Sequence, residues 1–351
     1  MRVLQCIWRM QVGGTEKQLV RLVSGLVRRG IDVHVATALA GDDEADIGSQ
    51  IHRVAPLFKY DVSTLLRLMA LFRRLRPDVV QTFLTQMDIF GGMAATVLRI
   101  PWVLSERSTA SAYPPTIRHR LRAIIGRRAD AVVPNSPGGA EYWRGIAPAI
   151  DQIEVIPNII PQSEIDAATP VIDPTLGDVV LYVGRFSEEK NLFTLLEALV
   201  PVLNRGKTTA VFCGEGYLRP VVEGKARTLG IADRARFLGN VANVWSWMKR
   251  ASVVVAVSTF EGSPNAVLEA AAAGTPLVIS DIPGYRTVLT DDAAWFVNGA
   301  SPQSISEGIL AALADRSEAA ARAARARQLI GVRSEEQIAM RYEHLYRDVI
   351  G

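Results

Sequence analysis

The sequence predicts an α/β protein made of two domains, each with a parallel β-sheet that carries helices on both faces. Short apolar runs of the kind that form buried strands alternate with helix-like segments along the whole chain. The length of 351 residues is that of about two ordinary domains. Residues 158–178 hold three prolines and a glycine with little periodicity, which is typical of a linker. We therefore assign residues 1–157 to the first domain and 179–334 to the second.

The composition is that of an ordinary soluble globular protein, with 49% apolar and 21% charged residues. Cys6 and Cys213 both lie in apolar strand-like runs, which indicates buried thiols in a reducing compartment and excludes a disulfide-rich scaffold. No apolar stretch reaches the roughly 18 residues of a membrane span, and Met1–Trp8 is too short for a signal peptide. The net charge of +3 is modest. We therefore expect a cytoplasmic protein with no nucleic-acid partner.

The first domain is predicted to begin with the strand Val3–Trp8, a loop with Gly13 and Gly14, and a helix that ends at Gly30. The segment Thr15–Gln18 has the spacing of a capping box for that helix. A glycine pair between a strand and a helix lets the backbone come close to a ligand. The dinucleotide fingerprint Gly-x-Gly-x-x-Gly is absent from this loop.

The remaining elements continue the alternation of strand and helix. In the first domain we expect strands at Asp32–Ala38, Val79–Leu84, Trp102–Ser105, Ala131–Val133 and Ile153–Ile156, and helices at Leu65–Leu75 and Gly91–Leu98. In the second domain we expect strands at Val179–Val183, Ala210–Cys213, Arg236–Leu238, Val253–Val257, Leu277–Ile279 and Trp295–Val297, and helices at Ala311–Arg327 and Glu335–Tyr346. The acidic loop Gly41–Asp46 is most simply a solvated loop.

The stretch Ser258–Ala270 has the strongest functional pattern. It follows the apolar strand Val253–Val257 and opens a helix, for which Ser263 is the expected cap and Pro264 the expected first residue. The backbone N–H groups of Ser263–Ala266 then lie at a helix N-terminus. Such a terminus favours phosphate through hydrogen bonds and through the helix dipole.

Two carboxylates bracket this phosphate-binding position. Asn265 and Glu269 are four residues apart and share one helix face, and Glu261 lies in the loop before the helix. Carboxylates repel phosphate but accept hydrogen bonds from hydroxyl groups, so the two glutamates suit a sugar and a ribose on either side of the phosphate. The alternative is that both glutamates only stabilise the positive end of a helix.

The segment Glu261–Ala270, with seven residues between its two glutamates, resembles the signature of the retaining glycosyltransferases of family 4. These enzymes use nucleotide-diphosphate sugars and have the GT-B fold, in which two Rossmann-like domains face each other across a cleft. The resemblance covers most of residues 179–298 and is thinner over residues 1–157. It implies that residues 335–351 form a C-terminal helix that crosses back to the first domain.

A second element supports the resemblance. Gly184, Arg185 and Lys190 resemble the family's Gly-Arg-x-x-x-x-Lys element, and they follow the first strand of the second domain, at the edge where open α/β sheets bind ligands. An arginine fork and a lysine charge would stabilise the negative charge on a leaving diphosphate. The alternative is a solvated loop in which Glu188 and Glu189 are simple ion-pair partners.

The resemblance implies a role for each matching residue. The catalytic residues would be Arg185 and Lys190, which bind the diphosphate, and Glu261, which binds the transferred sugar. Glu269 would bind the ribose. The other expected donor contacts are Gly13, Gly14, Gly184, Gly214, Leu238, Ser263, Pro264, Asn265 and Ala266. The segments at Gly214 and Leu238 are equally compatible with plain tight turns.

The acceptor side is less well defined. Many relatives carry a His after the strand that matches Val79–Leu84, whereas this chain offers Gln81 and Gln86 there. We take Gln86, Glu106 and Arg107 as the candidate acceptor residues. The resemblance implies retention at the anomeric carbon and a saccharide or lipid-linked saccharide acceptor, in cell-surface polysaccharide or glycolipid synthesis.

We expect no metal and no further cofactor. The residues Asp42, Asp43, Glu44 and Asp46 do not form the Asp-x-Asp metal site of GT-A enzymes, and basic residues already neutralise the diphosphate. Two other interpretations stay open. One is an epimerase of the GT-B fold that acts on nucleotide sugars, and the other is a non-catalytic subunit that binds them.

The segment Ile117–Arg128 predicts a helix with five arginines and with apolar residues at helical spacing. In one interpretation its apolar stripe packs on the domain's own sheet. In the other, its basic face, together with Arg73, Arg74 and Arg76, rests on anionic lipid. The second interpretation predicts a cytoplasmic enzyme that is peripheral on the inner face of the cell membrane.

Overall fold

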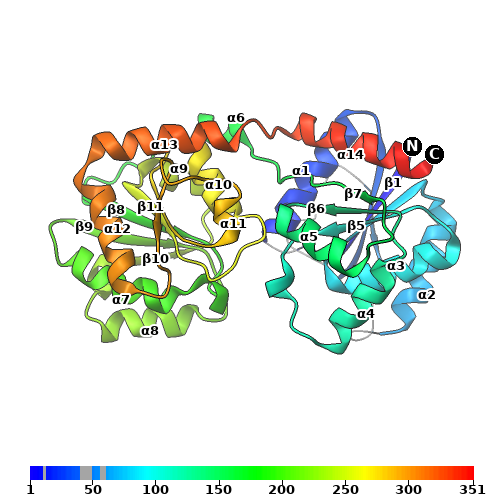
Figure 1. Ribbon diagram of the computed structural model, residues 1–351, viewed down its shortest axis with the longest axis horizontal. Coiled ribbons are helices and arrows are strands. Elements are labelled where there is room, and N and C mark those ends of the chain that lie inside the picture. The colour runs from blue at the N-terminus through cyan, green and yellow to red at the C-terminus, as the bar shows by residue number, and fades with distance from the viewer. Residues whose placement is uncertain (11–12, 40–49, 56–60) are drawn as a thin grey trace. The chain divides into compact units, whose positions relative to one another are not determined.

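The computed structural model describes residues 1–10, 13–39, 50–55 and 61–351, and the chain divides into two compact units (Figure 1). Unit 1 consists of Met1–Ile159 and Arg333–Gly351, and unit 2 consists of Ile160–Val332. The acidic loop expected at Gly41–Asp46 lies outside the described residues.

Unit 1 contains a seven-stranded parallel sheet with the strand order β3-β2-β1-β4-β5-β6-β7. Its central strand is buried continuously from Val3 to Trp8, as expected for a strand covered on both faces. The strands are β1 (Arg2–Arg9), β2 (Asp32–Leu39), β3 (Gln50–Arg53), β4 (Val79–Phe83), β5 (Trp102–Glu106), β6 (Ala131–Pro134) and β7 (Gln152–Ile153).

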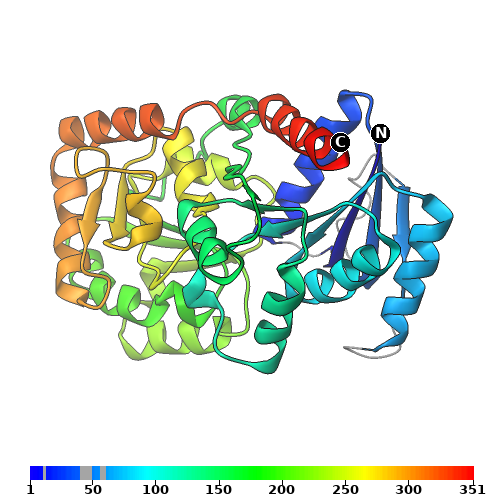
Figure 2. The same cartoon turned by 45° about the vertical axis from the view of Figure 1, so that its right-hand side comes forward.

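Two layers of helices cover the sheet of unit 1. One apolar core joins it to α1 and α14, and a second joins it to α2, α3, α4 and α5. The helices are α1 (Gly14–Arg28), α2 (Ser63–Leu75), α3 (Leu84–Leu98), α4 (Ile117–Gly126), α5 (Pro137–Ile146) and α14 (Glu335–Ile350). The C-terminal helix α14 lies beside α1 (Figure 2), and a side chain at Gly25 would meet the Cβ of Ala339 at 2.8 Å. The expectation that the last helix packs on the first domain is therefore correct.

Unit 2 contains a six-stranded parallel sheet with the strand order β10-β9-β8-β11-β12-β13. The strands are β8 (Asp178–Val183), β9 (Thr208–Cys213), β10 (Ala235–Gly239), β11 (Val253–Ala256), β12 (Leu277–Ser280) and β13 (Trp295–Val297). The helices are α6 (Gln162–Ala167), α7 (Leu192–Leu203), α8 (Arg219–Thr228), α9 (Val244–Arg250), α10 (Asn265–Ala272), α11 (Pro283–Arg286), α12 (Pro302–Ala314) and α13 (Arg316–Ile330). Separate apolar cores again fill the two faces.

Both sheets reverse their strand order at one point, between β1 and β4 in unit 1 and between β8 and β11 in unit 2. This is the doubly wound, Rossmann-like arrangement that the sequence predicts. Ligands of such sheets bind outside the carboxyl ends of the strands at the reversal point. The loops after these four strands are therefore where the functional residues are sought.

The linker prediction for residues 158–178 is wrong for most of that segment. Within this segment Gln162–Ala167 forms α6, and Ile160, Ile165 and Leu176 are buried in a core of unit 2. Its prolines lowered the helical periodicity, but its few large apolar side chains still pack on the sheet.

Three other predicted elements differ from the structure. The helix expected at Ala311–Arg327 is divided between α12 and α13, because Asp315 caps α13 by accepting hydrogen bonds from the N–H groups of Ser317 and Glu318. The helix expected to begin at Gly91 begins at Leu84. The strand expected at Ile153–Ile156 is the shorter β7, Gln152–Ile153. The edge strand β3 was not predicted.

Candidate active site

The reversal point of unit 2 brings two predicted side chains into direct contact. The ammonium Nζ of Lys190, after β8, lies 2.5 Å from Oε1 of Glu261, after β11. The hydroxyl of Ser258 donates to the same carboxylate oxygen at 2.8 Å. The two charged side chains are 22% and 14% exposed, so the pair is largely but not fully withdrawn from water. Residues 71 positions apart in the chain thus form one charged centre.

Backbone contacts hold the two loops together. The N–H of Thr259 donates to the carbonyl of Glu189 at 2.8 Å. The side-chain amide of Asn191 donates to the carbonyls of Val257 at 3.3 Å and Gly299 at 2.7 Å. Asn191 has φ of 55°, a conformation that asparagine tolerates better than most residues. The sequence analysis assigns no role to Asn191, although an asparagine between the loop after a strand and the next helix is a pattern that can be recognised in the sequence.

Arg185 lies in the same loop and is exposed. Its carbonyl accepts a hydrogen bond from the Tyr182 hydroxyl at 2.7 Å. No described residue forms a hydrogen bond or an ion pair with its guanidinium. The loop thus presents one cation that is paired with Glu261 and one that projects into solvent.

The glycines predicted at the strand ends are required by close backbone approach. The N–H of Gly184 donates to the carbonyl of Cys213, and the N–H of Gly214 donates to the carbonyl of Gly239. Gly214 has φ of +139°, and a Cβ there would lie 1.9 Å from the carbonyl oxygen of Gly184. Leu238 precedes Gly239 at the end of β10 and is 36% exposed. The two turns therefore pack against each other, as a tight-turn interpretation requires, and they lie at the ligand-binding edge of the sheet.

The start of α10 differs from the prediction. The helix begins at Asn265, so the cap position is Pro264 and not Ser263. The N–H of Asn265 donates to the carbonyl of Ser263 at 3.0 Å. Pro264 has no N–H group, so Ser263 and Ala266 remain as candidate phosphate donors among the four predicted residues. The side chain of Pro264 makes no capping hydrogen bond.

Glu269 lies on the first turns of α10 and is half-buried. Its Oε2 accepts a hydrogen bond from the indole Nε1 of Trp245 at 2.9 Å. Trp245 comes from α9, and the sequence analysis did not assign it to the site. The indole holds the carboxylate in place from a helix that is 24 residues away in the chain.

At the reversal point of unit 1, the cap of α1 is Gly13 and the helix begins at Gly14, which is exposed. Gly13 has no side chain with which to cap this helix. The predicted capping box at Thr15–Gln18 is wrong because the Gln18 amide has another partner. It donates to the carbonyl of Ile159 at 2.9 Å and accepts from its N–H at 2.7 Å.

Glu106 is the predicted site residue that the structure removes from the acceptor set. It is fully buried, and its carboxylate accepts hydrogen bonds from the Ser108 N–H, the Tyr113 hydroxyl, Arg122 and the Trp143 indole. A buried carboxylate is stable only when such partners satisfy it, and no accessible face is left for a substrate. Gln86 lies in the first turn of α3 and is half-buried.

Arg107 is held from three sides. Its guanidinium donates to Asn158 at 3.1 Å and to the Tyr342 hydroxyl at 3.2 Å, and it lies over the ring of Phe83 at 5.2 Å. No described carboxylate forms an ion pair with it. Tyr342 belongs to α14, so the C-terminal helix positions a candidate acceptor residue more than 200 positions upstream. The sequence analysis missed this contact.

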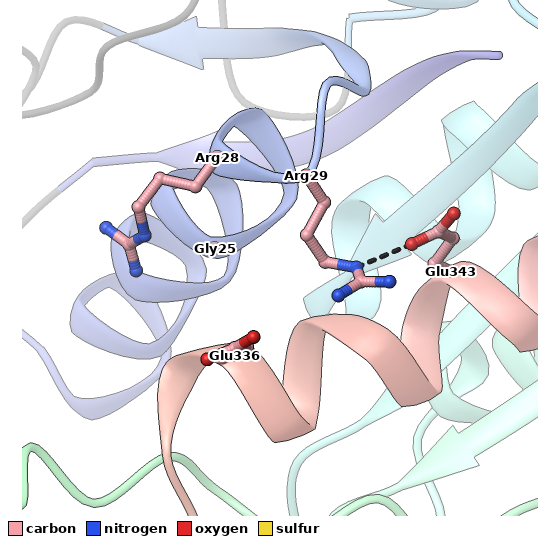
Figure 3. Close-up of a pocket in the computed structure, with 5 residues that line it drawn as sticks. All are labelled: Gly25, Arg28, Arg29, Glu336 and Glu343. Carbon is pink, nitrogen blue, oxygen red and sulfur yellow. Dashed lines mark hydrogen bonds and ion pairs between the residues drawn. The ribbon is translucent and has the colours of Figure 1, made fainter.

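A pocket of unit 1 lies elsewhere, between α1 and α14 (Figure 3). It has a volume of about 440 Å³ and is lined by Gly25, Arg28, Arg29, Glu336 and Glu343. Arg29 forms an ion pair with Glu343 at 2.5 Å, and Arg28 forms one with Glu335. None of the predicted site residues lines this pocket, and its charges join the two helices.

Within the described part of the chain, no three His, Cys, Asp or Glu side chains form a group that could hold a metal ion. Asp42, Asp43, Glu44 and Asp46 lie outside that part.

Two family models match the chain, and together they span nearly all of it. Glycosyltransferase Family 4 matches residues 12–164, and Glycosyl transferases group 1 matches residues 173–329. The chain is a family 4 glycosyltransferase of the GT-B fold. The motif at Glu261–Glu269 and the element at Arg185–Lys190 both lie within the second match.

Two of three relatives of this glycosyltransferase are named for lipid-linked or lipid substrates. It is 26% identical to an uncharacterised glycosyltransferase of Methanocaldococcus jannaschii, with 90% of each chain covered. It is 24% identical to an alpha-1,4-N-acetyl-D-galactosaminyltransferase of Campylobacter jejuni, named for an undecaprenol-diphosphate-linked saccharide, over 77% of this chain and 76% of that one. It is 32% identical to the phosphatidyl-myo-inositol mannosyltransferase of Mycobacterium leprae, over 52% of this chain and 48% of that one.

Solved structures support the fold of this glycosyltransferase. HepE of Anabaena, crystallised with UDP-glucose, superposes with a TM-score of 0.86 at 17% identity, over 99% of this chain and all of that one. WaaG, a glycosyltransferase of lipopolysaccharide biosynthesis, superposes with a TM-score of 0.78 at 17% identity, over 98% and 99% of the two chains. No described helix is long and apolar enough to cross a membrane.

Proposed function

We propose that this glycosyltransferase moves a sugar from a nucleotide-diphosphate sugar to a saccharide or lipid-linked saccharide, with retention at the anomeric carbon, in cell-surface polysaccharide or glycolipid synthesis. The observation that carries the proposal is the Lys190–Glu261 pair, which joins the two loops at the reversal point of the second sheet. The acceptor class is supported by the Campylobacter and mycobacterial relatives, whose names state lipid-linked or lipid acceptors.

Each charged side chain of the site would contact the donor. The diphosphate would bind Arg185, Lys190 and the N-terminus of α10, where the N–H groups of Ser263 and Ala266 lie. Glu269 would accept hydrogen bonds from the ribose hydroxyls while Trp245 holds its other oxygen. Gly184, Gly214 and Leu238 would lie beside the nucleoside, and Gly13 and Gly14 remain predicted diphosphate contacts.

The reaction builds negative charge on the leaving diphosphate as its bond to the sugar breaks. Arg185 and Lys190 would stabilise that charge, which is commonly a major contribution to catalysis of this type. Glu261 would hold the transferred sugar by its hydroxyl groups. We propose front-face attack by the acceptor hydroxyl, with a phosphate oxygen helping to remove its proton. Since two cations already neutralise the diphosphate, this mechanism needs no metal.

We also propose that the enzyme works as a peripheral protein at the inner face of the cell membrane. A lipid-linked acceptor diffuses in the plane of the membrane, so an enzyme held at that surface meets it more often. Arg107, half-buried and held by Asn158 and Tyr342, is our candidate in unit 1 for binding an acceptor group that carries negative charge.

The proposal is tested in two steps. A thermal-shift screen of nucleotide sugars identifies the donor, and release of nucleoside diphosphate is then measured with and without undecaprenol-linked saccharides. Acceptor-dependent release that is lost in Lys190→Ala supports transfer. Lys225→Ala is the matched control, because this lysine pairs with Glu197 on the surface of α7 and α8. Appearance of an epimer without diphosphate release, or donor binding without either reaction, would overturn the proposal.

A further inference from the structure

Asn191 lies between the turn that carries Lys190 and the helix α7. A 3-10 turn spans Glu188–Lys190 and α7 begins at Leu192, so the chain changes direction at Asn191. Its backbone has φ of 55° and ψ of 39°, the left-handed conformation. The helix that follows is anchored in the core of unit 2 by Leu192 and Leu195. The backbone of Asn191 therefore determines the direction in which Lys190 leaves that core.

The side-chain amide of Asn191 forms hydrogen bonds at both ends. Its nitrogen donates to the carbonyls of Val257 at 3.3 Å and Gly299 at 2.7 Å. Its oxygen accepts a hydrogen bond from the hydroxyl of Thr194 at 2.7 Å, which determines which end of the amide faces the two carbonyls. Val257 follows β11 and Gly299 follows β13. One side chain after β8 thus joins the loops after two other strands.

The loops that Asn191 joins are themselves held close together. A Cβ added to Gly299 would lie 3.0 Å from the Cβ of Ser280, so the loop after β13 packs on the end of β12. The hydroxyl of Ser280 donates to the carbonyl of Ser258 at 2.6 Å. The hydroxyl of Ser258 donates in turn to the carboxylate of Glu261 at 2.8 Å. Asn191 and Glu261 are therefore held by the same group of strand ends.

The backbone and the contacts at position 191 together explain why the residue is an asparagine. Glycine, asparagine and aspartate tolerate the left-handed conformation better than other residues. Of these three, only asparagine has side-chain N–H groups that can donate to two carbonyls. Aspartate would place a carboxylate oxygen against both carbonyl oxygens, and glycine would keep the backbone and lose both links. Substitutions at this one position therefore separate the backbone conformation from the hydrogen bonds.

We propose that Asn191 is a positioning residue that holds Lys190 against Glu261 for the transfer step. Lysine has a flexible four-carbon stem, so the place of its ammonium depends on where the backbone starts and on its partner. A misplacement of about 1 Å in such a site costs on the order of 10²-fold in rate. The inference rests on the proposed function for the diphosphate that Lys190 contacts. The ion pair that Asn191 holds is a feature of the structure itself.

The first test needs neither donor nor acceptor. The protein is treated with a limiting amount of acetic anhydride, and peptide mass spectrometry gives the acetylation rate of Lys190 relative to that of Lys225, which pairs with Glu197 outside the site. The contact with Glu261 slows acetylation of Lys190, because it must break before the nitrogen attacks the reagent.

We expect Asn191→Gly and Asn191→Asp each to raise this relative rate by about fivefold, since both lose the two links to carbonyls. Asn204→Gly is the matched control, because it makes the same chemical change at the other end of α7. It should leave the relative rate as in the wild type. An unchanged relative rate in Asn191→Gly and Asn191→Asp would overturn the proposal.

The second test is a double-mutant cycle on the transfer reaction. Asn191→Gly should lower kcat by about tenfold and change the donor KM by less than about threefold, because the donor contacts remain and only the ammonium is displaced. In a Lys190→Ala background the same substitution should have no further effect on kcat, since Asn191 acts through Lys190. A tenfold loss in both backgrounds would show that Asn191 only supports the fold, and the proposal would be wrong.

A third variant covers the case in which substitution of Asn191 prevents folding. Thr194→Val leaves the backbone at position 191 unchanged and removes the hydroxyl that orients the amide. It should raise the acetylation rate of Lys190 about twofold, and an unchanged rate would overturn the proposal. If the wild type transfers no sugar, the proposed function fails, whereas the acetylation rates still decide whether Asn191 holds Lys190.

Discussion

The ammonium of Lys190 and the carboxylate of Glu261 form an ion pair with 2.5 Å between Nζ and Oε1. We propose that both side chains bind the donor. In that proposal, the carboxylate of Glu261 lies where the diphosphate would contact Lys190, and the ammonium of Lys190 lies where the sugar would contact Glu261. A bound diphosphate would form a second ion pair with Lys190. The carboxylate of Glu261 would then accept hydrogen bonds from the sugar. Ser258 limits the movement, because its hydroxyl also donates to the carboxylate.

The cations should control the chemical step. We expect Lys190→Ala and Arg185→Ala each to lower kcat by roughly 10²- to 10³-fold, because each removes one stabiliser of the charge that develops on the leaving diphosphate. Steady-state kinetics with the identified donor measures the effect, with Lys225→Ala as the surface control. Near-normal kcat in both variants would contradict the assigned roles.

Glu269 should contribute mainly to nucleotide affinity. Glu269→Ala should weaken nucleoside diphosphate binding by about 1.5–3 kcal/mol, the usual cost of losing hydrogen bonds to a charged group. Trp245→Phe should weaken it by about 1 kcal/mol, because the indole N–H holds the carboxylate at 2.9 Å. Titration calorimetry measures both values. If the dissociation constant is the same in Glu269→Ala as in the wild type, this glutamate does not bind the ribose.

Arg107 should act on the acceptor and leave donor binding unchanged. We expect Arg107→Ala to raise the acceptor KM by about tenfold or more, and Tyr342→Phe to raise it only a few-fold, because the ring stays and one hydrogen bond to Arg107 is lost. Tyr346→Phe is the control, since its hydroxyl forms hydrogen bonds with Gln5 and Gln81 in the core and none with Arg107. Equal acceptor kinetics in Arg107→Ala and the wild type would remove Arg107 from the site.

Asp88 should make stability depend on pH. Burial raises the pKa of its carboxyl from 3.8 to about 6, against the opposing effects of Arg122 and the Thr82 hydroxyl. Between about pH 4 and pH 6 the folded protein therefore keeps a proton that the unfolded chain releases, and the free energy of unfolding falls as the pH rises. The full difference is about 3 kcal/mol at most.

Urea unfolding of the wild type and of Asp88→Asn across this range measures that loss. The variant should lack it, whereas Asp291→Asn, at an exposed ion pair with Arg286, should behave as the wild type. Parallel pH profiles for the wild type and Asp88→Asn would show that the carboxyl is ionised throughout.

Local patterns predicted most of the strands well. Val253–Val257 and Leu277–Ile279 are short apolar runs, and they form β11 and β12 within one residue at each end. Local sequence patterns predicted the elements less well where tertiary packing determines the backbone conformation. The helix α3 begins at Leu84 with φ of 69°, which no local preference of leucine favours.

The sequence by itself determined the two doubly wound sheets, the loops that carry Arg185, Lys190 and Glu261, and the family. Neighbouring residues determine the short-range periodicity and the positions of the loops. The doubly wound topology then brings the loops after β8 and β11 together. Only the tertiary structure decided that Glu106 and Arg122 are buried partners, that Trp245 holds Glu269, and that Tyr342 reaches Arg107. Whether a charged side chain is exposed or paired depends on residues far away in the chain, and no local pattern contains that information.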